Sequence, residues 1–500
     1  SGAAYRPSRR SITASDRLEE FAPIFYPKSH AVIGASADER KFGGRVMKVL
    51  LSFGYAGKVY PVNPRESQIL GFKTYSSVGD IPGPVDFATI TVPAEGVPEI
   101  VEQCLVKGIK ALQILTSGFS EISEAGRKLE ERIVNTAARG MRIIGPNCFG
   151  VYSPAGGLTI LPGENFPRES GPVAFIGQSG GYTNRVTQRA GAWGVRFSKV
   201  ISYGNASDVN ECDLLEYMHQ DPETRVIAAY LEGVKDGPRF FKLLQEVSKT
   251  KPVILWKGGL TPGGARAVHS HTGSLGGEEA IWNAVYRQSG TVRVNSLDEL
   301  VDTILAFQHL PPHQGRRVSV VGGGGGVGVA AADACERARL SVPMFSAELQ
   351  KKLLAIIPPV GSSARNPVDV GGPSVPPAIL KAVLEAVLTE GDMDTVIVDN
   401  LQMFLPGSSA GDRDEQSDSI VIERAEVPVD VKKKFGKPVM VVLPVEAMDA
   451  HAVEAEGARR RARDYYLGEG IPVFLTLERA ARALANVIGY YERRDAVSSF

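Results

Sequence analysis

The stretch His30-Ala31-Val32-Ile33-Gly34-Ala35-Ser36 is a run of mostly apolar residues that ends in a turn of small residues. The segment 41–53 follows it and carries apolar residues at helical spacing. A short apolar run bounded by such a turn is typical of a strand that is buried on both faces. The stretch therefore predicts one strand–turn–helix unit of a parallel sheet.

The same pattern recurs along the chain. Further apolar runs separated by amphipathic segments lie at 59–64, 86–93, 111–119, 142–148, 172–177, 197–202, 225–233, 252–257, 317–321, 395–398, 439–444 and 471–474. Strands that alternate with helices predict an α/β fold with parallel sheets covered on both faces. We expect an N-terminal arm at 1–21 and three α/β domains at 22–160, 161–312 and 313–500.

Composition narrows the function classes. The 500 residues contain 56 Lys+Arg and 56 Asp+Glu, so the formal charge is zero, which argues against a general nucleic-acid or anionic-membrane binder. The sequence contains no run of about 18 apolar residues, so no transmembrane helix is predicted. The basic segment 1–10 lacks the apolar core of a signal peptide. The four cysteines are far apart without metal-ligand spacing and indicate reduced thiols, so we expect a cytoplasmic protein without a bound metal.

The first turn favours an anionic ligand other than a nicotinamide dinucleotide. Residues 34–38 do not form Gly-x-Gly-x-x-Gly, and Asn63 stands where a dehydrogenase needs an acidic residue. Basic residues gather around this region: Arg40, Lys41, Arg45, Lys58 and Arg65. These features suit coenzyme A with its several phosphates. The predicted CoA-binding residues are Gly34, Ser36, Lys41, Val62, Asn63, Pro64, Arg65, Thr116, Ser117, Asn147 and Cys148, most of them near the carboxyl ends of strands.

Two glycine-rich turns are candidate phosphate sites. Gln178, Ser179, Gly180 and Gly181 follow the strand at 172–177, and the glycine run 322–326 follows the strand at 317–321. Small turns between a strand and a helix leave free backbone N–H groups at the positive end of the helix. We predict phosphate or acyl binding at the first turn and at Gly324, Gly325 and Gly326.

His271 lies in the stretch 266–277, between the strand at 252–257 and a helical pattern that starts near Glu278. We expect it on a loop, where its small neighbours leave room for a group on the ring. Neutral imidazole is a nucleophile that can carry a phosphoryl group. Glu232 ends an apolar strand, and burying a carboxylate without a partner is costly. Taken singly, the histidine also fits an ordinary surface loop, and the carboxylate also fits a solvent-facing position.

Taken together, these segments give the chain a resemblance to the alpha part of nucleoside-diphosphate-forming acyl-CoA synthetases, relatives of succinyl-CoA synthetase. The stretches that carry it are 145–150 (Gly-Pro-Asn-Cys-Phe-Gly), 178–181, 204–209 (Gly-Asn-Ala-Ser-Asp-Val), 230–233 (Tyr-Leu-Glu-Gly), 270–275 (Ser-His-Thr-Gly-Ser-Leu) and 366–369 (Asn-Pro-Val-Asp). They span nearly the whole chain. The resemblance implies a Rossmann-like CoA-binding domain followed by two flavodoxin-like domains.

The resemblance also implies a chemistry. Phosphate cleaves an acyl-CoA to an acyl phosphate, the phosphoryl group moves to a histidine, and from there it passes to a nucleoside diphosphate. By position His271 resembles the phosphorylated histidine and Glu232 its orienting carboxylate. The helices that follow Gln178 and Gly326 resemble the two helices whose N-termini steady the phosphohistidine.

Two departures from the family pattern matter. Asn184 stands where succinyl-CoA synthetases have a tyrosine in the substrate pocket, so the acid need not be succinate. No ATP-grasp segment or Gly-x-x-x-x-Gly-Lys-[Ser/Thr] motif is found, so we expect ATP or ADP with magnesium to bind an ATP-grasp beta chain, in an α2β2 assembly.

Three alternatives remain at this point. A CoA-binding regulatory protein without catalysis is disfavoured because His271 and Glu232 are both present. A nicotinamide-dependent dehydrogenase is disfavoured by the first turn and by Asn63. A thioesterase with Cys148 as nucleophile lacks a histidine nearby in sequence. The acid, the direction of the reaction and the choice of ATP or GTP stay open.

Overall fold

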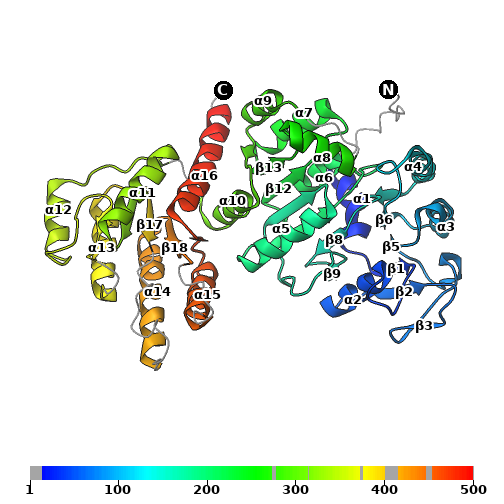
Figure 1. The fold of residues 1–500 in the computed structure, drawn as a ribbon, viewed down its shortest axis with the longest axis horizontal. Helices are drawn as coiled ribbons and strands as arrows, with labels where there is room; N and C mark the ends of the chain where they lie inside the picture. The colour runs from blue at the N-terminus through cyan, green and yellow to red at the C-terminus, as the bar shows by residue number, and fades with distance from the viewer. Residues whose placement is uncertain are drawn as a thin grey trace. The chain divides into compact units, whose positions relative to one another are not determined.

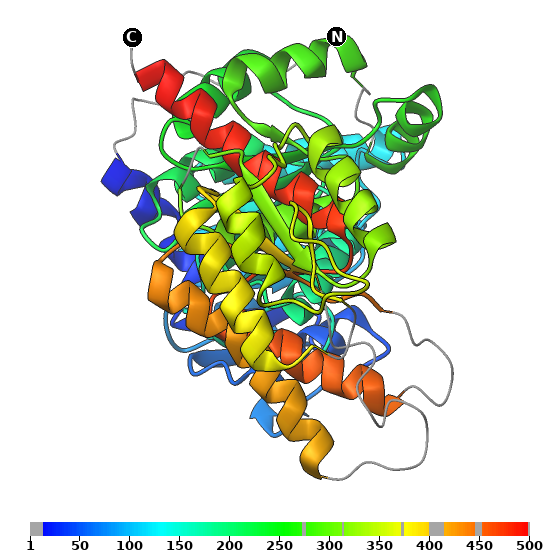
Figure 2. The same ribbon diagram turned by 90° about the vertical axis from the view of Figure 1, so that its left-hand side faces the viewer.

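The computed structural model describes residues 14–272, 277–312, 315–371, 375–399, 415–445 and 453–498 (Figures 1 and 2). The chain forms two compact units, Ser1–Leu297 and Asp298–Phe500. Each unit is described by itself. The first contains two large sheets and the second contains one.

The first sheet is parallel, with the order β2-β1-β5-β6-β7. Its strands are β1 (Ser29–Ile33), β2 (Lys58–Val62), β5 (Phe87–Ile90), β6 (Ala111–Ile114) and β7 (Arg142–Ile144). Its helices are α2 (Phe42–Phe53), α3 (Val97–Lys107) and α4 (Glu124–Ala137). Strands β1, β5, β6 and β7 are buried along their whole length, as continuous apolar runs predict. A small hairpin, β3 (Gln68–Ile69) and β4 (Phe72–Lys73), lies beside it.

The second sheet has the order β14-β13-β12-β10-β11-β8-β9. Its parallel part is β10 (Val173–Gly177), β11 (Phe197–Ser202), β12 (Val226–Leu231), β13 (Val253–Lys257) and β14 (Val292–Arg293). Its helices are α5 (Gly180–Ala192), α6 (Glu211–Gln220), α7 (Gly237–Val247), α8 (Pro262–Thr272) and α9 (Glu279–Ser289). The antiparallel strands β8 (Gly150–Ser153) and β9 (Leu158–Thr159) extend it beyond β11. The predicted boundary at residue 160 is thus too late, because residues 150–159 pair with the second sheet.

The second unit has one parallel sheet, with the order β16-β15-β17-β18-β19. Its strands are β15 (Val318–Gly322), β16 (Val368–Asp369), β17 (Thr395–Asp399), β18 (Val439–Val442) and β19 (Val473–Phe474). Its helices are α10 (Leu297–His309), α11 (Gly325–Arg337), α12 (Ala347–Leu354), α13 (Pro377–Glu390), α14 (Glu415–Phe435), α15 (Val453–Gly468) and α16 (Leu477–Ser498). Figure 2 shows α13 and α14 side by side, where they pack together. The Asp302 carboxylate of α10 accepts a hydrogen bond from Arg479 Nε of α16 at 2.6 Å, so α10 belongs here and the predicted boundary at 312 is also late. Within the described residues, no helix is both long and apolar enough to cross a membrane.

All three parallel sheets share one strand order: second, first, third, fourth, fifth in sequence. This is a doubly wound arrangement, and it confirms the predicted α/β fold class. In such sheets ligands bind at the carboxyl ends of the strands, where the order reverses. The reversal points lie between β1 and β5, between β10 and β12, and between β15 and β17.

The predicted N-terminal arm is partly wrong. Helix α1 (Ala14–Phe25) begins within it and packs in the core of the first unit. The rings of Phe21 and Phe25 stack on Tyr217 of α6, with centroid distances of 5.2 and 4.8 Å. Apolar residues of α1 thus cover the second sheet's helix layer.

A buried ion network joins the two sheets of the first unit. Arg142 begins β7, and its guanidinium contacts Asp213 of α6 at 2.7 Å, Asp208 at 3.1 Å and Glu20 of α1. Asp213 also pairs with Arg239 of α7 at 2.9 Å. Burial raises the pKa of Asp213, but the nearby arginines outweigh it, so the net pKa lies below its usual value. The network therefore holds charged groups in place between two sheets.

We predict that Arg142→Met lowers the free energy of unfolding by about 3–5 kcal/mol, because it leaves buried carboxylates without their cation. Chemical denaturation checks this. The matched control is Arg127→Met: Arg127 also pairs with two carboxylates, Glu124 and Glu131, but on the exposed surface of α4. Equal losses in the two variants would contradict a structural role for the network.

Candidate active site

The turns after the first two strands of the first sheet, β1 and β2, meet at one edge. The Gly34 N–H donates to the Val62 carbonyl at 3.0 Å. The Asn63 amide donates from Nδ2 to the Ala35 carbonyl at 2.9 Å, and its Oδ1 accepts from the Arg65 N–H at 2.9 Å. Gly34 has φ +87°, and a Cβ there would lie 2.6 Å from Thr91 Oγ1, so the turn requires glycine. Asn63 thus binds backbone at the position where a dehydrogenase presents a carboxylate.

The remaining predicted CoA residues lie along the same edge, at the ends of β6 and β7. Thr116 Oγ1 donates to the Val92 carbonyl at 2.6 Å, and the Thr116 carbonyl accepts from the Asn147 N–H at 2.9 Å. Ser117 and Pro64 are exposed, Ser36 and Asn147 are half-buried, and Val62 is buried. The predicted residues are therefore gathered at one edge of the sheet.

The basic residues around this edge divide into two groups. Arg40 pairs with Asp38 at 2.9 Å, and this hydrogen bond lowers the pKa of Asp38 to about 2; Arg45 Nε donates to the Glu39 carbonyl at 3.2 Å. Lys41 and Arg65 are exposed. Lys41 is the N-cap of α2, and its side chain does not cap the helix. Gly43 and Gly44 in the first turn are buried, and a Cβ there would lie 1.9 Å from the Gly34 carbonyl oxygen and 2.0 Å from the Asp38 carbonyl oxygen, so this turn packs closely against backbone. Lys41 and Arg65 are therefore exposed cations at this edge that can hold the phosphates of a ligand.

Cys148 does not fit its predicted role. Its side chain is 2% exposed, and its thiol donates to the Ile114 carbonyl with a sulfur–oxygen distance of 3.3 Å. Burial raises the pKa of this thiol to about 12. The thiol faces the interior, so the geometry supports neither contact with coenzyme A nor a nucleophilic role.

The second sheet brings Gln178 and Glu232 together where its strand order reverses. Gln178 follows β10, and its side-chain oxygen accepts from the N–H groups of Glu232 at 2.8 Å and Gly233 at 2.9 Å, just after β12. Glu232 is 4% exposed, so its carboxylate is buried and does not point to solvent. The Tyr230 hydroxyl donates to Glu232 Oε1 at 3.3 Å.

Helix α5 starts beside these residues. Ser179 is its N-cap, with Oγ 3.5 Å from the Tyr182 nitrogen, and Gly180 and Gly181 are its first residues. A Cβ at Gly181 would meet nothing within 4 Å, so this side of the helix start is open. An open helix N-terminus beside a buried carboxylate suits a phosphoryl group that is transferred to a neighbouring base.

The expectation of a loop around His271 is partly wrong. The backbone is helical through α8 (Pro262–Thr272), so position 271 lies in the last turn of a helix. Residues 273–276 and the side chain of His271 lie outside the described part of the structure. The helical pattern predicted near Glu278 is confirmed, because α9 begins at Glu279 with Glu278 as its N-cap.

The glycine run of the second unit opens α11. Gly324 has φ +101° and is the N-cap of this helix, which begins at Gly325. Asp369 Oδ1, at the end of β16, accepts from the N–H groups of Gly324 and Gly371, both at 3.0 Å. A Cβ at Gly326 would meet nothing within 4 Å. The helix start is therefore held in position and open, as an anion site requires.

Sequence analysis missed Lys257. It ends β13 with 4% exposure, and its ammonium donates to the backbone carbonyls of Glu232, at 2.8 Å, and Gly258. Sequence analysis also assigned Asp369 no role of its own, since this residue appeared only within the stretch 366–369. The signal that could have found Lys257 is the one used for Glu232: a charged residue at the end of an apolar strand.

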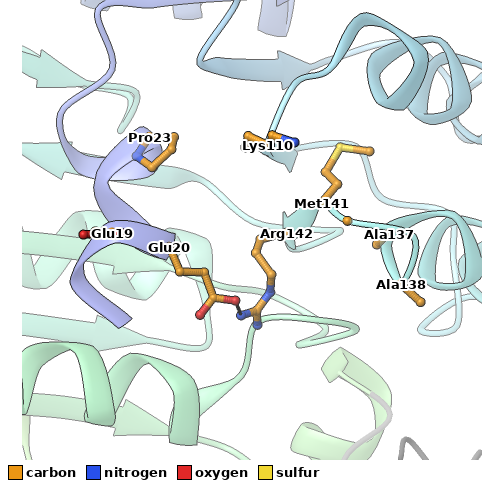
Figure 3. A pocket seen from close by; sticks show the side chains of 9 residues that line it. Glu19, Glu20, Pro23, Lys110, Ala137, Ala138, Met141 and Arg142 are labelled. Atoms are coloured by element: carbon orange, nitrogen blue, oxygen red, sulfur yellow. Dashed lines mark hydrogen bonds and ion pairs between the residues drawn. The ribbon is translucent and has the colours of Figure 1, made fainter. Parts of the chain in front are cut away.

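A hollow of about 450 Å³ lies elsewhere on the first unit (Figure 3). Figure 3 shows Glu20 and Arg142 joined by the ion pair described above, with Lys110 and Met141 nearby. Lys110 precedes β6 and Arg142 begins β7, so the hollow is at the amino ends of the strands. It is therefore on the opposite edge from the predicted CoA site.

Three stretches match known domain families. Residues 28–154 match the CoA binding domain, 170–307 the succinyl-CoA ligase like flavodoxin domain, and 318–407 the ligase-CoA domain. The alpha subunit of acetate–CoA ligase [ADP-forming] I from Pyrococcus furiosus is 40% identical over 469 residues, which covers 92% of this chain and 96% of the relative. The chain belongs to the alpha subunits of the ADP-forming acyl-CoA synthetases. This family lies in the succinyl-CoA synthetase superfamily, which confirms the predicted resemblance.

Other similarities agree. A solved structure of the dinucleotide-forming acetyl-coenzyme A synthetase 1 of Ca. Korarchaeum cryptofilum, in complex with phosphate and ADP, has a TM-score of 0.80 and 32% identity and covers 96% of this chain and 98% of that chain. The acetate–CoA ligase [ADP-forming] of Methanocaldococcus jannaschii is 40% identical over 71% of this chain, and the match spans half of that relative. Relatives of this family thus differ in how much sequence accompanies the matched part.

Proposed function

We propose that this chain acts as the alpha subunit of an ADP-forming acyl-CoA synthetase and carries a phosphoryl group on His271. The reaction converts an acid, CoA and ATP to acyl-CoA, ADP and phosphate, and it is reversible. The main structural support is that Gln178 and Glu232 are hydrogen-bonded to each other beside the N-terminus of α5. The second support is that the chain is 40% identical to an ADP-forming alpha subunit over nearly its full length.

In the direction of ATP synthesis, the proposed reaction has three steps. A phosphate oxygen attacks the thioester carbon, the carbon–sulfur bond breaks, and CoA leaves as the thiol. A ring nitrogen of His271 then attacks phosphorus of the acyl phosphate, and the acid leaves as its carboxylate. Finally a terminal oxygen of ADP attacks the phosphohistidine, which releases neutral histidine and ATP.

Glu232 has the proposed role of orienting the ring. A carboxylate that accepts the hydrogen bond of one ring nitrogen leaves the other as the nucleophile and stabilises the positive charge that develops on phosphorylation. The Gln178 side chain supports this role because it holds the Glu232 backbone. The open N-termini of α5 and α11 are proposed to stabilise phosphoryl oxygens; they lie in different units, so their joint use remains a prediction.

Coenzyme A is proposed to bind the edge formed by Gly34, Asn63 and Thr116, with its phosphates at Lys41 and Arg65. The acid is proposed to be a small carboxylic acid. Relatives are named for acetate and for 4-hydroxybutyrate, so the family accommodates acids of different length. Asn184 of α5 is consistent with an acid other than succinate.

The nucleotide is proposed to bind an ATP-grasp beta chain together with magnesium, in an α2β2 assembly. Two observations support a second chain: the relatives of similar length are named as alpha subunits, and a relative named as the whole ligase is about twice as long as the matched part. Magnesium would neutralise charge on the transferred phosphoryl group.

We predict that acetyl-CoA and labelled phosphate place acid-labile phosphate on His271. The reason is that the stretch 270–275 resembles the phosphohistidine segment of this family, and that position 271 lies in the last turn of α8, which follows β13. Mass spectrometry of the phosphopeptide locates the label, and His269→Ala is the control. Label on His269, or label that persists in His271→Ala, would contradict the assignment.

Glu232→Gln should slow His271 phosphorylation by about 10²–10³-fold, the usual effect of one electrostatic partner. CoA affinity should stay the same, because Glu232 belongs to the second sheet. Rapid-quench single-turnover measurement gives the rate and calorimetry gives the affinity. Glu246→Gln on exposed α7 is the control. An unchanged single-turnover rate in Glu232→Gln rules out the role.

Lys41→Ala and Arg65→Ala should each weaken CoA binding by about 3–10-fold, because a partly exposed charge-assisted contact is worth roughly 1 kcal/mol. Calorimetry on the full chain tests this, since residues 150–159 belong to the second sheet and a 1–160 fragment would lack their partners. Lys128→Ala on exposed α4 is the charge-matched control. Binding of NADH without CoA would favour a dehydrogenase.

We predict that the chain alone makes no ATP from acyl-CoA, ADP, phosphate and magnesium, although it is phosphorylated. Transfer to ADP needs a site that holds two nucleotide phosphates and a metal ion. A coupled assay with the chain alone, and then with the beta chain added, measures this. Full turnover by the chain alone would show that it contains its own nucleotide site.

A further inference from the structure

Lys257 is a buried cation at the centre of the candidate site. Its side chain is 4% exposed, at the carboxyl end of β13. The ammonium donates to the Glu232 carbonyl at 2.8 Å and to the Gly258 carbonyl, and it lies 5.4 Å from the centre of the Trp282 ring. Burial lowers the pKa of Lys257 to about 8, although the Glu232 carboxylate acts in the opposite direction.

This environment is unfavourable for a lysine. Burying an ammonium group costs several kcal/mol unless an anion and further hydrogen bonds compensate. Within the described residues, no carboxylate oxygen forms an ion pair with Lys257; two carbonyl oxygens and an indole ring surround it instead. An apolar side chain would fit the end of this apolar strand at lower cost, so fold stability does not account for the lysine.

The groups that Lys257 contacts indicate its role. The Glu232 carbonyl belongs to the residue proposed to orient His271. Gly258 is the first residue of the connection that leads from β13 into α8, and Trp282 lies in the first turn of α9. One ammonium group therefore contacts the strand end of Glu232 and both flanks of the segment 258–282, which contains His271.

We propose that Lys257 is a positioning residue that fixes both flanks of the His271 segment relative to Glu232. This inference rests on the proposed phosphoryl transfer and adds a residue to it. Among the described residues, the Lys257 ammonium contacts the Glu232 and Gly258 carbonyls and the Trp282 ring. It acts through the Glu232 backbone, the Gly258 turn and Trp282.

Lys251 provides a matched control at the other end of the same strand. Its ammonium also donates to two backbone carbonyls, those of Met218 at 2.9 Å and Asp221 at 2.8 Å, and burial also lowers its pKa. It precedes β13, so it lies at the amino edge of the sheet, away from Glu232. A lysine that serves only to hold backbone should behave like Lys251.

The experiment compares full-length Lys257→Met, Lys257→Arg and Lys251→Met with the unmodified chain. Acetyl-CoA and labelled phosphate are added, and the single-turnover rate of His271 labelling is measured along with CoA affinity. We expect Lys257→Met to slow labelling by about 10²-fold, the usual effect of misplacing a reacting group by about 1 Å, with unchanged CoA affinity. Lys257→Arg should restore most of the rate because it keeps the charge and the donors. Lys251→Met should label at the normal rate.

Trp282→Leu is the second variant, because it leaves the hydrogen bonds of Lys257 in place and Trp282 is only half-buried. It should slow labelling roughly tenfold, within the range of a partly desolvated cation–π contact. Normal labelling in both Lys257→Met and Trp282→Leu, or an equal loss in Lys251→Met, overturns the inference. If Lys257→Met does not fold, the labelling rate of Trp282→Leu alone tests the inference, and a normal rate overturns it.

Hydrogen exchange separates failure of this inference from failure of the proposed function. Amides at 232–234, 258–262 and 279–286 should exchange faster in Lys257→Met than in Lys251→Met, whether or not phosphate is transferred. If the unmodified chain is not labelled on His271, the proposed function falls, and exchange alone judges the positioning role. Unchanged exchange at these segments overturns it.

Discussion

The guanidinium of Arg142 is the contact on which the geometry of the first unit depends. It begins the last strand of the first sheet and binds carboxylates from α1, from the 204–209 loop and from α6. The proposed CoA edge and the Glu232 site are built on different sheets. Whatever fixes β7 relative to α6 therefore fixes the CoA edge relative to Glu232.

The carboxyl edges of the same sheets are also joined directly. The N–H groups of Asn205 and Ser207 donate to the carbonyls of Pro146 and Gly145, at 3.0 and 3.2 Å. These bonds tie the turn after β7 to the turn after β11. Ion pairs of Arg142 hold the amino end of β7, and backbone hydrogen bonds hold the turn at its carboxyl end. The strand therefore cannot shift along its axis without breaking the ion pairs or these hydrogen bonds. The proposed reaction brings the thioester of CoA from the first edge to phosphate beside Glu232, and such chemistry is sensitive to misplacement of about 1 Å.

Sequence analysis predicted the elements well because strands buried on both faces are continuous apolar runs, such as 30–33 and 173–177. It failed where structure depends on distant partners. Residues 150–159 follow the first sheet in sequence, but their partner is β11, which no local pattern reveals. Helix α1 was not predicted because it is stabilised by packing against Tyr217, which lies nearly two hundred positions away in sequence.

The same distinction applies to the candidate site. Glu232 and the glycine turns could be proposed from the sequence because a charge at a strand end and clustered glycines are visible there. Cys148 was assigned to the ligand because it belongs to a motif, and its inward orientation follows from the Ile114 carbonyl of a neighbouring strand. Lys257 was missed because its partners are backbone carbonyls, which every residue possesses and which give no signal in the sequence.

A common device underlies all three carboxyl edges. In each sheet one polar side chain at the end of a strand binds backbone of the turn after a neighbouring strand: Asn63 binds Ala35, Gln178 binds Glu232 and Gly233, and Asp369 binds Gly324. These side chains hold the turns in position, and Gly181 and Gly326 leave one side of the starts of α5 and α11 open. Donors that are already oriented need no reorganisation when charge develops on a phosphoryl group. The repeated strand order places a helix start beside each reversal point, so one architectural rule supplies three candidate ligand edges. The identity of the neighbouring side chain determines what each edge can do. Beside α2 the neighbours are Lys41 and Arg65, which suit binding; beside α5 the neighbour is a buried Glu232, which suits transfer to a base.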